Sequence, residues 1–135
     1  MINLTRFSEP LLSILRIVTG LLFFAHGSAK LLQFPSTQHF ADGVPLFSFT
    51  GFTGTLEFVG GALIVIGLFT RIAAFILSGM MAVAYFMAHA PQGLHPINNG
   101  GELAILFCFI FLYIAAAGPG PWSADAILRP QRGHA

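Results

Sequence analysis

Five titratable side chains lie within or at the ends of long apolar stretches, where a charge is costly: His26, Lys30, Glu57, His89 and Glu102. A carboxylate whose pKa is raised by burial can take up or release a proton at neutral pH. A histidine or a lysine beside it can hydrogen-bond the oxygen atoms of a substrate. These residue types could therefore transfer protons in a reduction or an oxidation, if the fold brings them together.

The composition indicates that these side chains lie in a membrane protein. Of the 135 residues, 56% are hydrophobic and only 8% are charged, whereas a soluble domain usually has about 25% charged residues. The length corresponds to a single domain over residues 1–135. The net charge of +1 argues against a nucleic-acid partner, and the single Cys108 excludes an intramolecular disulfide.

Four apolar stretches predict four membrane-spanning helices, at about residues 11–32, 53–69, 72–88 and 101–118. A helix needs about 20 residues to cross the hydrocarbon core, and the fourth stretch approaches that length only if Gly101 and Glu102 begin it. After it, Ser123 could cap a short surface helix. The predicted fold is an all-α, four-helix membrane bundle with this short C-terminal helix, and its bilayer is expected to be a bacterial inner (plasma) membrane.

The arginines predict the orientation of the bundle. Four spans place both termini and the turn between the second and third spans on one side. That side carries Arg6, Arg16, Arg71, Arg129 and Arg132, and the other side has only Lys30. By the positive-inside rule, both termini are expected in the cytoplasm, and the loops at residues 33–52 and 89–101 are expected to face outward.

Helical periodicity places the polar residues of each span on one face, together with small residues that let helices approach closely. The simplest packing turns these faces inward and forms a polar pocket that opens outward. The candidate catalytic residues are His26, Lys30, Glu57 and Glu102; the candidate substrate-binding residues are Phe23, Tyr85, His89 and Phe109; and Arg16 and Arg71 are candidate structural charges. Alternatively, Lys30 or His26 pairs with Glu57 or Glu102 only to hold the helices in register.

The two halves of the chain repeat the same order of residue types. The first half has Arg16, His26 and then Glu57, and the second has Arg71, His89 and then Glu102. This order is consistent with a parallel duplication of a two-helix unit about an axis along the membrane normal.

Four sequence motifs resemble those of the DoxX family of small four-helix membrane proteins. They are "RIVTGLLFFAHGSAKL", "LEFVGGALIVIGLFTR", "NNGGELAIL" and "GPGPWSAD", and the resemblance covers roughly residues 12–128. It implies an oxidoreductase or an oxidoreductase subunit, with relatives associated with thiosulfate:quinone oxidoreduction, quinone or thiol stress, and a membrane complex with superoxide dismutase and a sulfurtransferase. It marks His26, Lys30, Glu57, Arg71 and Glu102 as family positions without assigning them roles.

The sequence is compatible with three functions. In the first, a quinone lies among phenylalanines (Phe23, Phe24, Phe58 and Phe109), His26 or Lys30 binds its carbonyl, and Glu57 or Glu102 relays a proton.

In the second, a metal is bound by His26, His89, Glu57 and Glu102, or a haem by the two histidines.

The third is a transporter, which would favour a homo-oligomer, or a membrane anchor for a soluble redox partner. The outward loops are rich in phenylalanine, so they are expected to fold over the pocket or into the membrane interface.

Overall fold

The computed structural model describes residues 2–129, and within them it is helical without strands. Arg132, which entered the orientation argument, lies outside these residues. The principal helices are α1 Ser8–Leu32, α2 Phe49–Ile66, α3 Thr70–Ala84 and α5 Glu102–Ala117. The shorter elements are η1 Thr5–Phe7, η2 Gln38–Phe40, η3 Tyr85–His89 (a π-helix), η4 Ala90–Gln92, α4 Pro96–Asn99 and α6 Ala124–Leu128.

Among residues 2–129, three helical stretches are long and apolar enough to cross a membrane. They have 28, 18 and 23 residues, over Thr5–Leu32, Phe49–Ile66 and Thr70–Gln92. The fourth, α5, is apolar but has 16 residues, which corresponds to about 24 Å at 1.5 Å per residue. The prediction of an all-α membrane bundle is confirmed, although α5 is one residue shorter at each end than predicted.

The start of α2 differs from the prediction, and the difference changes the depth of Glu57. The helix begins at Phe49 because the side chain of Ser48 caps it by accepting a hydrogen bond from the Gly51 amide, 3.1 Å away. Glu57 therefore lies more than two turns from the beginning of α2, rather than the single turn expected.

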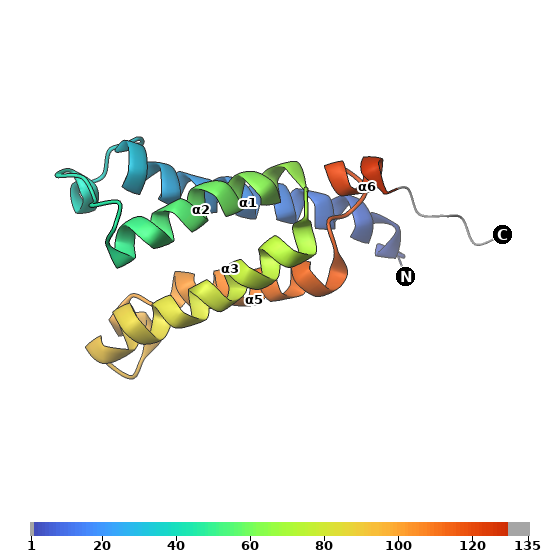
Figure 1. Ribbon diagram of the computed structural model, residues 1–135. Coiled ribbons are helices and arrows are strands. Elements are labelled where there is room, and N and C mark those ends of the chain that lie inside the picture. Colours follow the sequence, from blue (N-terminus) through green and yellow to red (C-terminus); the bar gives the residue numbers. More distant parts are fainter. Residues whose placement is uncertain (1, 130–135) are drawn as a thin grey trace.

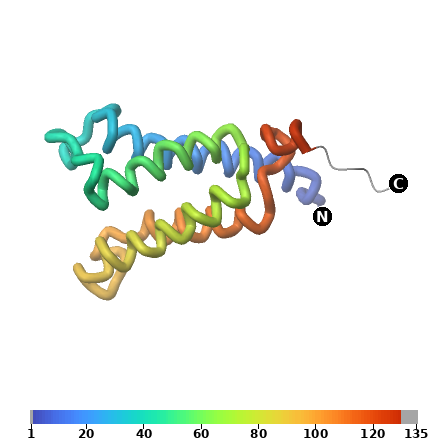
Figure 2. The backbone as a smooth tube through the Cα atoms, viewed as in Figure 1, coloured from blue at the N-terminus to red at the C-terminus, as the bar shows by residue number. Residues whose placement is uncertain are grey.

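The helices form two antiparallel hairpins. In the first hairpin α1 packs along α2, and in the second α3 packs along α5, with less contact between the two (Figure 1). The start of α1 and all of α6 lie at one end, here called the tail end; residues 33–48 and 85–101 lie at the other, here called the loop end. In the tube of Figure 2 the hairpins meet near the tail end and diverge toward the loop end.

The two helices of the first hairpin approach each other at glycines. A Cβ atom added to Gly61 would lie 2.7 Å from the backbone nitrogen of Phe24, and one added to Gly27 would lie closer still to that of Phe58. Backbone therefore packs on backbone along this interface, as the small residues on the polar faces predict.

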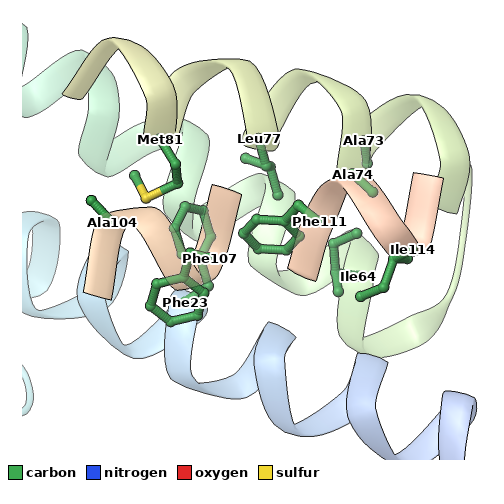
Figure 3. Packing of buried hydrophobic residues seen from close by; sticks show 10 residues of the cluster. All are labelled: Phe23, Ile64, Ala73, Ala74, Leu77, Met81, Ala104, Phe107, Phe111 and Ile114. Carbon is green, nitrogen blue, oxygen red and sulfur yellow. The ribbon is translucent and has the colours of Figure 1, made fainter. Parts of the chain in front are cut away.

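The apolar core lies mainly in the second hairpin. Figure 3 shows side chains of α3 and α5 meeting there, with Phe23 of α1 and Ile64 of α2 packed against them. The ring of Phe23 is edge-on to Phe107 and Phe111, at centroid distances of 5.3 and 4.9 Å. Such aromatic pairs contribute about 0.5–1.5 kcal/mol each beyond their buried area, so Phe23 joins the two hairpins.

Arginines close both hairpins at the tail end. Arg16, which is fully buried, donates hydrogen bonds of 2.7 Å to the carbonyls of Ile64 and Val65 at the end of α2. Arg71 donates in the same way to Ala115 and Ala116 at the end of α5. Both guanidinium groups thus satisfy carbonyls that a helix end leaves unpaired, at its negative pole. The shared arrangement is consistent with the predicted duplication.

The segment after α5 is fastened to both hairpins. Arg16 also donates to the carbonyls of Pro119, at 2.7 Å, and Trp122. Ser123 caps α6 by accepting a hydrogen bond of 3.1 Å from the Ala126 amide, which confirms the predicted C-terminal helix.

Asp125, in the first turn of α6, connects this helix to the start of α3, which the sequence did not indicate. Its carboxylate accepts hydrogen bonds of 2.9 Å from the amides of Phe69 and Thr70, where α3 begins. Burial raises the pKa of Asp125, but these bonds and the charge of Arg129 outweigh it and hold the pKa below its ordinary value. The two hydrogen bonds to Asp125 also hold Phe69 in its left-handed conformation, with φ of +50°.

Candidate functional site

A buried ion pair joins the helices of the first hairpin near the loop end. Lys30 Nζ lies 2.8 Å from Glu57 Oε1 and 3.4 Å from Thr53 Oγ1. The side chains of Lys30 and Glu57 are only 14% and 6% exposed. This pairing is one of those expected if the charged residues only hold the helices in register.

Glu57 has a second carboxylate oxygen that the pair leaves unsatisfied. Oε2 is buried and has no hydrogen-bond partner among the residues that the structure describes. A buried acceptor without a partner costs about 1–3 kcal/mol, and more when it carries charge. A proton on this oxygen, or a hydrogen-bond donor beside it, would remove that cost.

His26 lies one turn before Lys30 on α1 and faces the second hairpin. Its side chain is exposed, and its ring centroid lies 6.1 Å from that of Phe107, nearly perpendicular to it. Phe107 is 4% exposed and also contacts Phe23. His26 is thus an accessible imidazole beside an aromatic cluster that both hairpins share.

Phe107 replaces Phe109 as the α5 phenylalanine next to the predicted site. Phe109 is 64% exposed and points away from the core, whereas Phe107 and Phe111 point into it (Figure 3). The other two phenylalanines proposed to surround a quinone, Phe24 and Phe58, pack on each other between α1 and α2 with ring centroids 4.5 Å apart.

The remaining candidates lie at the loop end of the second hairpin. Tyr85 and His89 begin and end the π-helix, and both are half-buried. Both contact Asn99, a buried residue that sequence reasoning did not single out: its side-chain amide nitrogen lies 3.3 Å from the Tyr85 hydroxyl, and its carbonyl 3.1 Å from His89 Nδ1. Glu102 begins α5 with an exposed side chain.

The structure therefore divides the predicted pocket residues into two groups. Over residues 2–129, ion pairs and hydrogen bonds connect them only within a hairpin: Lys30 with Glu57 in the first, and Tyr85 and His89 with Asn99 in the second. Aromatic contacts through Phe23, His26 and Phe107 cross between the hairpins.

The four candidate metal ligands are not brought together. In the part of the chain that the structure describes, no three His, Cys, Asp or Glu side chains are close enough to hold a metal ion. His26 and His89, the candidate haem ligands, lie on different hairpins.

The loop between α1 and α2 covers the ion pair from the loop end. The Phe40 ring centroid lies 5.9 Å from Lys30 Nζ, in reach of a cation–π contact. The same end has an apolar hollow of about 440 Å³. Its lining residues are Leu46, Phe47, Ser48, Phe52 and Thr55, none of which was predicted to bind substrate.

The fold and this buried pair define the class of the molecule: a small, multi-pass helical membrane protein with a lysine–glutamate pair near one end of its spans. The DoxX family model matches residues 11–90, and the chain belongs to the DoxX family.

Three relatives cover most of this chain. An uncharacterized protein of Haemophilus influenzae is 44% identical over 126 residues, which are 91% of this chain and 94% of the relative. The inner membrane protein YqjF of Escherichia coli is 32% identical, over 84% of this chain and 88% of the relative. A Bacillus subtilis protein named "Putative oxidoreductase CatD" is 35% identical, over 78% of this chain and 77% of the relative. No solved structure matches the chain significantly.

Proposed function

We propose that this protein is the membrane subunit of an oxidoreductase and that it binds a quinone, or a similar two-electron carrier, beside the Lys30–Glu57 pair. The observation that carries the proposal is Glu57 Oε2, a buried carboxylate oxygen without a partner among the described residues. The name of the Bacillus subtilis relative supports the redox class.

Glu57 and the side chains next to His26 offer groups that suit the chemistry of such a carrier. A quinone reduced by two electrons takes up two protons, one on each oxygen. His26 can donate a hydrogen bond to one carbonyl, and the free oxygen of Glu57 can hold a proton for transfer. Phe23 and Phe107 provide an aromatic surface next to His26.

The electrons come from outside this chain. The single Cys108 cannot form a dithiol within one copy. We therefore infer that the electron donor is a soluble redox partner or a dissolved reductant. By the positive-inside argument the loop end faces outward, and the Glu57 proton then exchanges with the outer side of the inner membrane. The description of the Escherichia coli relative as an inner membrane protein supports that location.

Quinone binding by the purified protein in lipid nanodiscs tests the proposal. Decylubiquinol, the reduced form, has hydroxyl groups that can donate to Glu57 Oε2. It is titrated under anaerobic conditions against wild type, Glu57→Gln and, as a matched control, Glu102→Gln at an exposed position. We expect Glu57→Gln to weaken binding about tenfold or more, since a hydrogen bond to a charged group contributes about 1.5–3 kcal/mol, and Glu102→Gln to leave binding unchanged. Equal affinities of wild type and Glu57→Gln would refute the proposal, as would no binding by wild type.

A further inference from the structure

The loop end of the second hairpin carries a polar cluster that the proposed function does not use. Tyr85 and His89 lie four residues apart on the five-residue π-helix, with their ring centroids 6.4 Å apart and their planes inclined by 30°. Single π-helical turns are rare and occur frequently at functional sites.

Asn99 holds this cluster in place. It is 3% exposed, and its amide nitrogen donates to the Gly93 carbonyl at 2.9 Å and to the Tyr85 oxygen at 3.3 Å. Its amide oxygen accepts a bond of 2.8 Å from the Gly101 nitrogen. The Asn99 side chain thus uses both N–H groups and its oxygen to position its surroundings.

The glycines after Asn99 are needed for this arrangement. A Cβ atom on Gly101 would collide with the Tyr85 ring, and Gly100 has a φ of +73°, which favours glycine. The residues "NNGG", which begin the family motif "NNGGELAIL", therefore form the surface against which Tyr85 and His89 pack.

The hydrogen bonds determine which atoms stay free. The Asn99 carbonyl can only accept, so His89 Nδ1 carries a proton, and in the neutral ring Nε2 keeps a lone pair. The Tyr85 oxygen accepts from Asn99, so its own O–H can donate. Neither Nε2 of His89 nor the Tyr85 O–H has a partner of its own among residues 2–129.

We propose that Tyr85 and His89 form a second binding site, for the hydroxyl group of a small neutral phenol. A hydroxyl group can accept from the Tyr85 O–H and donate to His89 Nε2 at the same time. A carboxylate has no proton to give to Nε2, and a methyl ether has none either. A phenol is a stronger donor than an aliphatic alcohol because it is more acidic, and the exposed ring of Phe86, 5.3 Å from that of Tyr85, can cover the aromatic part.

Nitrogen NMR of ¹⁵N-histidine-labelled full-length protein in lipid nanodiscs tests this site directly. Hydroquinone is titrated, and 1,4-dimethoxybenzene, with the same ring and no hydroxyl proton, is the control ligand. The variant His89→Gln assigns the signal, and His95→Gln, at an exposed position in the same loop, is its matched control. Tyr85→Phe keeps the ring and removes only the hydroxyl.

We expect hydroquinone to shift the His89 Nε2 resonance in a saturable way and dimethoxybenzene to leave it unshifted. Tyr85→Phe should weaken binding about three- to tenfold, the usual effect of one hydrogen bond. Equal shifts from both ligands, or equal affinities in Tyr85→Phe and wild type, would overturn the proposal.

The site is independent of the Lys30–Glu57 pair, and the experiment separates the two proposals. The titration is repeated in Glu57→Gln, where the His89 shift should be unchanged. Loss of the His89 response in that variant would also overturn an independent site, whereas failure of decylubiquinol to bind would bear only on the proposed function.

Discussion

The two hairpins have the same plan at the tail end and opposite chemistry at the loop end. At the tail end Arg16 and Arg71 each donate to the last carbonyls of the partner helix. At the loop end the first hairpin buries a charged pair, and the second buries a neutral amide that organises a tyrosine and a histidine. The two hairpins thus share their closing contact at the tail end and differ in their chemistry at the loop end.

The largest effect is expected from breaking the charged pair. Lys30→Met leaves the Glu57 carboxylate buried without its cation, which typically costs about 3–5 kcal/mol of stability. Thermal unfolding in detergent should show the loss, and the double variant Lys30→Met/Glu57→Met should recover most of it. A Lys30→Met protein as stable as wild type would mean that Glu57 is neutral in the folded protein.

The next effect tests the glycine contact of the first hairpin. Gly27→Leu places a side chain against the backbone of Phe58 and should cost about 1–3 kcal/mol through overpacking. The matched control is Gly79→Leu, because the space next to Gly79 is open. The same unfolding assay compares them, and equal melting temperatures would show that the helices can separate at little cost.

A smaller effect is expected at the polar cluster of Tyr85, His89 and Asn99. Asn99→Ala removes three hydrogen bonds of the side chain and leaves the Gly101 amide without its acceptor, for a loss of about 1–3 kcal/mol. The loss should remain below that of Lys30→Met because no charge is left unpaired. The reverse order of melting temperatures would contradict the contrast between the hairpins.

The smallest effect concerns the contact of α6 with α3. Because the pKa of Asp125 is lower in the folded protein than in the unfolded chain, its contribution to stability is present above about pH 4 and is lost as the pH falls through the folded pKa. Asp125→Asn should lower stability at pH 6 by about 1 kcal/mol, as the loss of a helix cap does, and should remove this part of the acid dependence. Parallel curves of melting temperature against pH for the two proteins would exclude the role.

Most of the fold could be predicted from the sequence because each span is marked by its own composition. Glycines next to polar residues also marked the close α1–α2 interface. The rotation of α5 could not be predicted in this way: the helix is apolar all round, so no periodicity distinguishes Phe107 from Phe109.

The site was predicted in part. Lys30 and Glu57 stood out because charges are rare in such a sequence, but their pairing was one alternative among several. Asn99 lies in a polar, glycine-containing stretch typical of a loop, and Asp125 contacts residues more than 50 positions earlier. Contacts of that kind depend on how the hairpins and the tail pack, which the pattern of a single stretch does not record.

The partners of Arg16 also bear on how the chain is made. Two of its acceptors, Pro119 and Trp122, follow it by 103 and 106 positions. During synthesis this guanidinium enters the bilayer with its helix long before those carbonyls leave the ribosome. Until the last segment is made, the Arg16 guanidinium lacks two of its four carbonyl acceptors. In that interval we expect water, lipid phosphates or an insertion factor to accept hydrogen bonds from it instead.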